Sequence, residues 1–126
     1  MGSIHTFSPV KHFVGVLVSD RQLIAPIKDR LAALYGTIDH ESPVIPFDFT
    51  DYYAGEMGDT DRVFFSFERL IEADQLAHIK RQTNEIEGEI KPLSGAVKRA
   101  VNLDPGYLEN AKVVLASTKN FYHRIY

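Results

Sequence analysis

The sequence has 126 residues, of which 44% are hydrophobic and 25% are charged, and its net charge is −3. These values predict a single globular domain, residues 1–126, and argue against disorder, while the small net charge disfavours a nucleic-acid partner. No apolar run approaches the ~20 residues that a membrane span needs, so no membrane association is expected. Cysteine is absent, which excludes disulfides and cysteine-ligated metals; with no signal sequence in view, we expect a cytoplasmic protein.

The first half of the chain predicts a strand, a helix and a second strand. Residues 11–19 predict a strand, and residues 13–18 within it are apolar on both faces, which is typical of a central strand. Residues 20–35 carry apolar side chains at helical spacing and end before Gly36, a favoured helix stop. Residues 37–50 look extended, but their two prolines remove ladder donors and favour a sheet edge.

The second half continues with a strand, a helix and two further strands. Residues 61–67 place bulky side chains on both faces, which again favours a central position. Asp74 is the expected N-cap of the second helix. Residues 98–103 form a strand that ends in a turn at residues 104–106, and residues 112–118 form a fifth strand.

The order of these elements predicts an α+β fold, specifically a ferredoxin-like βαββαβ plait with at least one additional C-terminal strand. In that arrangement the first and third strands are central and the second lies at an edge. The two doubly apolar strands and the proline-containing strand fall at those places.

Common nucleotide and RNA motifs are absent or incomplete. No P-loop and no Gly-x-Gly-x-x-Gly sequence occurs. The aromatic residues of the first and third strands resemble an RNA-recognition surface, but Val63 and Phe65 stand where that motif has small residues. Packing under the fifth strand explains these aromatics equally well.

The first polar cluster is an acidic and aromatic segment, in which five acidic residues occur between Asp48 and Asp61. Carboxylates in such density can hold a divalent cation through oxygen. The alternative is a solvated acidic loop with tyrosines packed beside it. The candidate metal ligands are Asp48, Asp51 and Glu56, and the candidate ligand contacts are Thr50, Tyr52 and Tyr53.

The second cluster, Thr83 and Asn84, lies inside the second helix, where both residues are indifferent helix formers. A Thr83 hydroxyl that bonds back to the preceding turn is the structural alternative to a binding role. Asn84 is the candidate ligand contact of this cluster.

The third cluster follows the fourth strand. Asn102 and Asp104 alternate with Leu103, so their side chains should share one strand face. They would serve either an Asx-type turn or a polar strand end that faces a cleft. In the second case the further candidates are Tyr107 as a ligand contact, Lys119 and Arg124 as cations, and His123 as the proton carrier of any catalysed step.

Several motifs in one order closely resemble an uncharacterised prokaryotic family, number forty-four sixteen in the domain-of-unknown-function series. The resemblance runs from about Val10 to the last residue and is carried by residues 47–53, 56–58, 83–87, 102–107, 115–119 and 123–126. The family has no established activity, and the "GTP-binding" label of some members lacks a P-loop here. Members typically continue past the position of Tyr126, so the chain is either a natural full length or a truncation.

The leading functional hypothesis is one site for a small-molecule or phosphate-bearing ligand, metal-assisted if a cation is present, with no reaction assigned. It requires that the three clusters converge within one pocket. Two alternatives stay open: a non-catalytic module that forms homo-oligomers through its sheet, and a site for GTP or another nucleotide without a P-loop.

Overall fold

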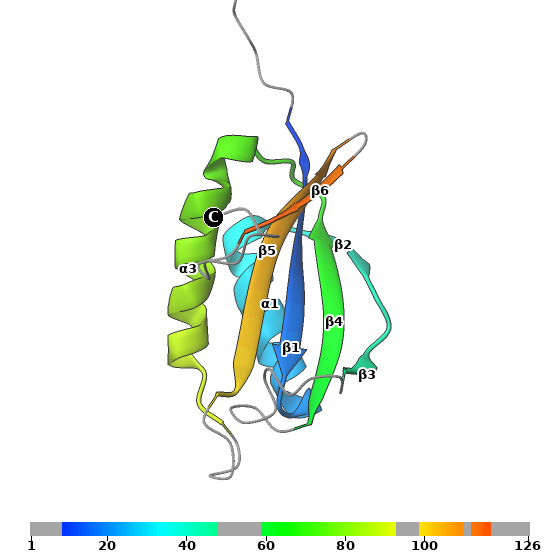
Figure 1. The fold of residues 1–126 in the computed structure, drawn as a ribbon, viewed down its shortest axis with the longest axis vertical. Helices are drawn as coiled ribbons and strands as arrows, with labels where there is room; N and C mark the ends of the chain where they lie inside the picture. Colours follow the sequence, from blue (N-terminus) through cyan, green and yellow to red (C-terminus); the bar gives the residue numbers. More distant parts are fainter. Residues whose placement is uncertain (1–8, 48–58, 93–98, 110–111, 117–126) are drawn as a thin grey trace, which may run out of the picture.

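The computed structural model describes residues 9–47, 59–92, 99–109 and 112–116 (Figure 1). Within these ranges two α-helices pack on a six-stranded antiparallel sheet, which confirms the predicted mixed α+β class. Within the same ranges no helix is long and apolar enough to cross a bilayer.

Each helix begins with a short 3-10 turn, and one strand predicted as a unit is divided in two. In chain order the elements are β1 (Lys11–Val18), η1 (Arg21–Leu23), α1 (Ile24–Tyr35), β2 (Ile38–Glu41), β3 (Ile45–Phe47), β4 (Thr60–Phe67), η2 (Ala73–Gln75), α3 (Leu76–Glu89), β5 (Val101–Glu109) and β6 (Lys112–Leu115).

The strand order is β2-β4-β1-β5-β6, and β3 also pairs with β4. The predicted central positions of β1 and β4 are therefore confirmed. The proline-containing segment lies at the edge as predicted, where β2 and β3 pair in turn with β4. Helix α1 ends at Gly36, whose positive φ of 93° is the conformation that favours glycine.

The core lies between the helices and one face of the sheet (Figure 1). Alternate residues of the central strands enter it, so that Val63, Phe65 and Phe67 are fully buried as their spacing predicted. His12 is fully buried in the same layer, where its ring stacks on Phe67 and meets the edge of Tyr35.

The opposite face of the central strands carries aromatic rings laid over glycines. Phe13 pairs across the strands with Gly106, and Phe64 pairs with Gly15. A Cβ atom at residue 15 would lie 2.9 Å from the Phe64 ring, so the glycine permits this close approach.

The predicted turn at residues 104–106 is wrong, because β5 runs without interruption to Glu109. Pro105 fits inside the strand because its backbone nitrogen and carbonyl point away from β1. The carbonyl accepts a hydrogen bond from the Ala116 N–H instead. The missing proline N–H therefore removes no bond between β1 and β5.

The predicted capping role of Asp74 is also wrong. Glu72 is the N-cap of η2, the 3-10 turn that leads into α3. It forms a capping box with Gln75, in which each side chain accepts a hydrogen bond from the other residue's backbone N–H. Asp74 lies within the first turn that follows.

Candidate functional site

Four of the predicted site residues lie in the described part of the chain: Asn84, Asn102, Asp104 and Tyr107. The remaining candidates lie outside the described residues, and their convergence stays a prediction; they are Asp48, Thr50, Asp51, Tyr52, Tyr53, Glu56, Lys119, His123 and Arg124.

Asn102 and Asp104 share one face of β5, as their alternation predicted. The Asn102 side-chain amide donates to Asp104 Oδ2 at 2.9 Å, and the two residues are only 5% and 8% exposed. Tyr107 lies on the other face of the strand and packs against the hydrophobic core. The structure thus separates Tyr107 from the two polar residues.

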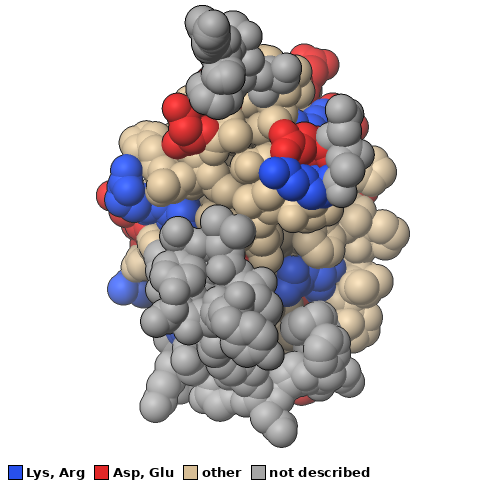
Figure 2. Space-filling model, turned by 45° about the horizontal axis from the view of Figure 1, so that its top comes forward, with Lys and Arg blue, Asp and Glu red and all other residues tan. Residues whose placement is uncertain are grey.

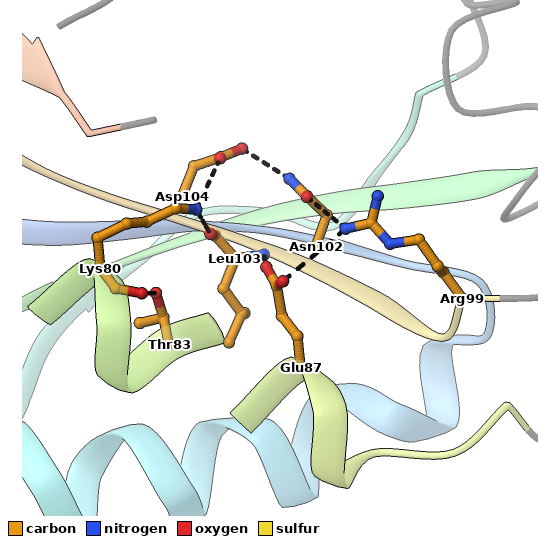
Figure 3. A network of polar contacts seen from close by, with 7 residues as sticks. All are labelled: Lys80, Thr83, Glu87, Arg99, Asn102, Leu103 and Asp104. Atoms are coloured by element: carbon orange, nitrogen blue, oxygen red, sulfur yellow. Dashed lines mark hydrogen bonds and ion pairs between the residues drawn. The ribbon is translucent and has the colours of Figure 1, made fainter. Parts of the chain in front are cut away.

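The first half of β5 is paired on one side by β1, while β6 begins its pairing only at Gly106. Side chains of α3 occupy the other side (Figure 3). Lys80 Nζ donates to the Leu103 carbonyl at 2.8 Å, and Glu87 Oε2 accepts from the Leu103 N–H at 2.6 Å. Lys80 and Glu87 are about two turns apart on one helix face, so they satisfy the backbone groups that a neighbouring strand would otherwise satisfy.

These side chains belong to a continuous polar network (Figure 3). Lys80 Nζ lies 3.7 Å from Asp104 Oδ1, and Arg99 Nη2 donates to Asn102 Oδ1 at 2.7 Å. Arg99 Nη2 also lies 3.9 Å from Glu87 Oε1. Buried charges are costly unless they are paired and hydrogen-bonded, and this network provides both kinds of partner.

Thr83 secures the helix beside this network. Its hydroxyl donates to the Lys80 carbonyl at 3.0 Å, which confirms the predicted bond to the preceding turn. Thr83 itself is fully buried, so it has a structural role and lends the site no accessible hydroxyl.

Glu87 is the group whose protonation the surroundings perturb most clearly in this network. Burial raises the pKa of its carboxyl, although the Leu103 N–H and the charges of Lys80 and Arg99 act in the opposite direction. The effect of burial on this carboxyl therefore outweighs that of its hydrogen-bond donor and of the two cations.

A cavity of about 380 Å³ opens where the end of α3 meets the start of β5. Its described polar lining consists of the amide of Asn84, the carboxylate of Glu87, the guanidinium of Arg99 and the ammonium of Lys91. Among the described residues, Gly88, Ile90, Pro92, Ala100 and Val101 also line it. Arg99 and Glu87 thus belong both to the cavity wall and to the network that contains Asn102 and Asp104.

The described residues offer no group of three His, Asp or Glu side chains suited to hold a metal ion. Of the two network carboxylates, Asp104 accepts from Asn102 and faces Lys80, while Glu87 accepts from a backbone N–H. The described lining of the cavity thus offers an amide, a carboxylate, a guanidinium and an ammonium.

A second, apolar groove of about 300 Å³ lies on the helix-free face of the sheet, lined in part by Phe13, Phe64 and Leu108. Arg62 lies over the Phe64 ring, with its guanidinium carbon 5.2 Å from the ring centroid. On the face shown in Figure 2, the described acidic and basic side chains are interspersed. The described side chains of that face therefore form no continuous cationic path for a nucleic-acid backbone.

Sequence reasoning did not identify Lys80, Glu87 or Arg99 as site residues. Lys80 and Glu87 look like ordinary solvated charges on the polar side of an amphipathic helix. Their spacing could have indicated this role, because Lys80 and Glu87 are opposite charges about two turns apart that border the apolar face of the helix next to Thr83.

A family model described as Domain of unknown function (DUF4416) matches residues 8–126, and confirms the family resemblance found in the motifs. No curated protein and no solved structure matches the chain.

Proposed function

We propose that this chain, which belongs to the family described as Domain of unknown function (DUF4416), binds a small polar molecule in the cavity between α3 and β5. The observation that carries the proposal is the convergence of Asn84, Glu87 and Arg99 on one cavity. Its volume of about 380 Å³ falls at the lower end of the range of small-molecule sites, which favours a compact ligand.

Two polar side chains of the cavity, Arg99 and Glu87, are held in place before any ligand arrives. Arg99 is anchored by Asn102, and Glu87 is anchored by the Leu103 N–H. Groups that are already ordered lose little conformational entropy on binding, so their hydrogen bonds contribute more of their energy to affinity. Their preorganisation supports a binding role over a purely structural one.

The cations at the cavity support a ligand with an anionic group. Arg99 and Lys91 place two positive charges on the described wall, and positive side chains of these kinds attract a carboxylate or a phosphate. A phosphate-bearing ligand, GTP or another nucleotide included, remains within this proposal and would be bound without a P-loop.

The architecture forms a second part of the proposal. We assign the ferredoxin-like plait to this chain, with β6 as its additional strand. The strand order β2-β4-β1-β5 and the antiparallel pairing of all neighbours support this assignment.

One observation favours a second function, an interaction module that forms homo-oligomers. Phe64 and Leu108 are 40% and 42% exposed beside the apolar groove of the sheet. Exposed apolar surface of this kind can mark an interface. Size-exclusion chromatography with light scattering tests it: a concentration-dependent dimer that Phe64→Ser abolishes supports the module, and a monomer at all concentrations refutes it.

A thermal-shift screen tests the binding proposal. The panel holds nucleotides, sugar phosphates, carboxylates and amino acids, and the proteins are the wild type, Asn84→Ala and the exposed control Glu85→Ala. A ligand at 100 times its dissociation constant adds about 2.7 kcal/mol to the stability of the protein. We expect at least one class of compound to raise the melting temperature of the wild type and the control and to act more weakly on Asn84→Ala. Equal shifts in all three proteins, or none with any compound, would refute the proposed site.

A further inference from the structure

We infer that the cavity between α3 and β5 recognises a ligand with adjacent hydroxyl groups beside a phosphate, the chemistry of a sugar phosphate. The inference rests on the proposed binding function and specifies the ligand class of the same site. It follows from two neighbouring side chains of α3, Asn84 and Glu87, which line the cavity with hydrogen-bonding groups to spare.

Asn84 and Glu87 are three residues apart on α3, so their side chains are neighbours on one face of the helix. Both line the cavity. The Asn84 side chain is half-buried and has no hydrogen-bond partner among the described residues. Its amide therefore retains two N–H donors and a carbonyl acceptor for a ligand.

Glu87 presents an acceptor next to this amide. Its Oε2 accepts from the Leu103 N–H at 2.6 Å, which fixes the carboxyl group in place. Its Oε1 lies 3.9 Å from Arg99 Nη2, which is beyond hydrogen-bond distance. The side chain is only 18% exposed, and a buried oxygen of this kind is normally hydrogen-bonded. Oε1 is therefore the place for a donor from the ligand.

A neutral donor suits Glu87 better than a ligand cation does. Arg99 and Lys91 line the same wall and Lys80 faces the carboxyl group from its own helix, so a ligand ammonium would enter among like charges. A hydroxyl donates without adding charge, and it also accepts. Two adjacent hydroxyls can thus donate to Glu87 Oε1 and accept from the Asn84 amide at once. Acidic side chains bind ribose hydroxyls in a similar way at dinucleotide sites.

Lys91 supplies the positive charge for the phosphate of the same ligand. It follows the end of α3 and lines the cavity with an exposed side chain, where a phosphate can stay partly hydrated. The apolar part of the wall, which includes Ile90 and Val101, lies against the carbon skeleton. Hydroxyls at Asn84 and Glu87 and a phosphate at Lys91 together describe a sugar phosphate.

Isothermal titration calorimetry on the whole chain at neutral pH tests the inference with two pairs of probes. Ribose 5-phosphate is compared with tetrahydrofurfuryl phosphate, which keeps the ring and the phosphate but lacks the hydroxyls. Glycerol 3-phosphate is compared with propyl phosphate, which differs in the same way without a ring. We expect the hydroxylated member of at least one pair to bind at least about tenfold more tightly, because a hydrogen bond to a charged group contributes at least about that factor.

The variant Glu87→Gln removes the charged acceptor and keeps the structural role of residue 87, because a glutamine oxygen can still accept from the Leu103 N–H. The measured quantity is the ratio of the two dissociation constants within a pair, in which the effect of the lost charge on the phosphate cancels. We expect Glu87→Gln to reduce this ratio about tenfold and the exposed control Glu85→Gln to leave it unchanged. Lys91→Ala should weaken both members of a pair equally, by about two- to fivefold.

The outcomes separate the two proposals. If compounds of the thermal-shift panel bind and Asn84→Ala weakens them, but the hydroxyls add nothing in either pair, the binding function stands and the sugar-phosphate inference is overturned. If no compound binds in a way that Asn84→Ala weakens, the binding function itself fails. A preference for hydroxyls that Glu87→Gln leaves unchanged also overturns the inference, because the hydroxyls then have another partner.

Discussion

Glu87 on α3 accepts a hydrogen bond from the backbone N–H of Leu103 on β5 at 2.6 Å, while Lys80 on the same helix donates to the Leu103 carbonyl. Two helix side chains thus make the hydrogen bonds to the Leu103 backbone that a neighbouring strand would otherwise make. Because Glu87 also lines the cavity, its contribution to the free energy of unfolding has to be measured separately from its effect on ligand binding.

We predict that Glu87→Leu loses about 1–3 kcal/mol of unfolding free energy relative to Glu87→Gln. The leucine leaves the Leu103 N–H without its acceptor, and an unsatisfied buried donor carries a cost of that order. Urea denaturation of both variants measures the difference. Equal stabilities would mean that water satisfies this N–H and that the helix side chain is dispensable.

Lys80→Met should destabilise the protein by about 3 kcal/mol. The substitution removes the partner of the Leu103 carbonyl and leaves Asp104 as a nearly buried carboxylate without its cation. The control is Lys28→Met, which removes an exposed ion pair with Glu41 and should cost less than about 1 kcal/mol.

The double variant Lys80→Met/Asp104→Asn checks the reason for that loss. It removes both charges at once, so its cost should fall short of the sum of the single variants by about 0.5–3 kcal/mol. Additive costs in urea denaturation would show that Lys80 and Asp104 contribute independently.

Three glycine-to-alanine variants should rank in a fixed order of stability. A Cβ at Gly106 would lie 2.4 Å from the Val114 backbone oxygen, so Gly106→Ala should lose about 1–3 kcal/mol. At Gly15 the nearest atoms belong to the movable side chains of Phe64 and Arg62, so the loss should be smaller. Gly88 has open space around its Cβ position and lies in α3, where alanine should gain about 0.5–1 kcal/mol. Thermal unfolding gives the ranking, and a Gly15→Ala variant less stable than Gly106→Ala would contradict it.

His12 should make the protein less stable in mild acid. Its ring is fully buried, neither ring nitrogen has a hydrogen-bond partner among the described residues, and burial lowers its pKa from 6.5 to about 4. Between these two values the unfolded chain binds a proton that the folded chain excludes, so stability falls as the pH drops from about 6.5 to about 4. The full loss attributable to His12 is about 3 kcal/mol.

The variant His12→Phe isolates this contribution, since phenylalanine can keep the stacking on Phe67 without titrating. Urea denaturation at a series of pH values should give a smaller loss of stability below pH 6.5 for the variant than for the wild type. Identical pH profiles would show that His12 is protonated in the folded core or that its titration is irrelevant to stability.

The sequence was sufficient to predict the order of the elements and the centre of the sheet, because apolar alternation in residues 61–67 depends on burial alone. It was misleading at Pro105, whose neighbours suggest a turn. A proline is tolerated inside a strand when its nitrogen faces away from the paired neighbour, and that orientation depends on which strand lies on each side.

The candidate site was predicted only in part for a similar reason. The shared face of Asn102 and Asp104 follows from strand geometry, and their hydrogen bond confirms it. The contributions of Lys80, Glu87 and Arg99 depend on the docking of α3 against β5, which is a tertiary contact between segments distant in the chain. Local patterns in the helix cannot reveal which charged residues a strand edge will meet.

The central claim is that Asn84, Glu87 and Arg99 form a ligand site, and side-chain nuclear magnetic resonance tests it most directly. In a titration with amino acids, carboxylates and phosphates, we predict that one class saturably shifts the Asn84 side-chain amide and the Arg99 Nε–H signals. The exposed Gln22 side-chain amide should stay unmoved. Saturable binding that leaves the Asn84 and Arg99 signals in place would contradict the account, and so would the absence of any saturable shift across the panel.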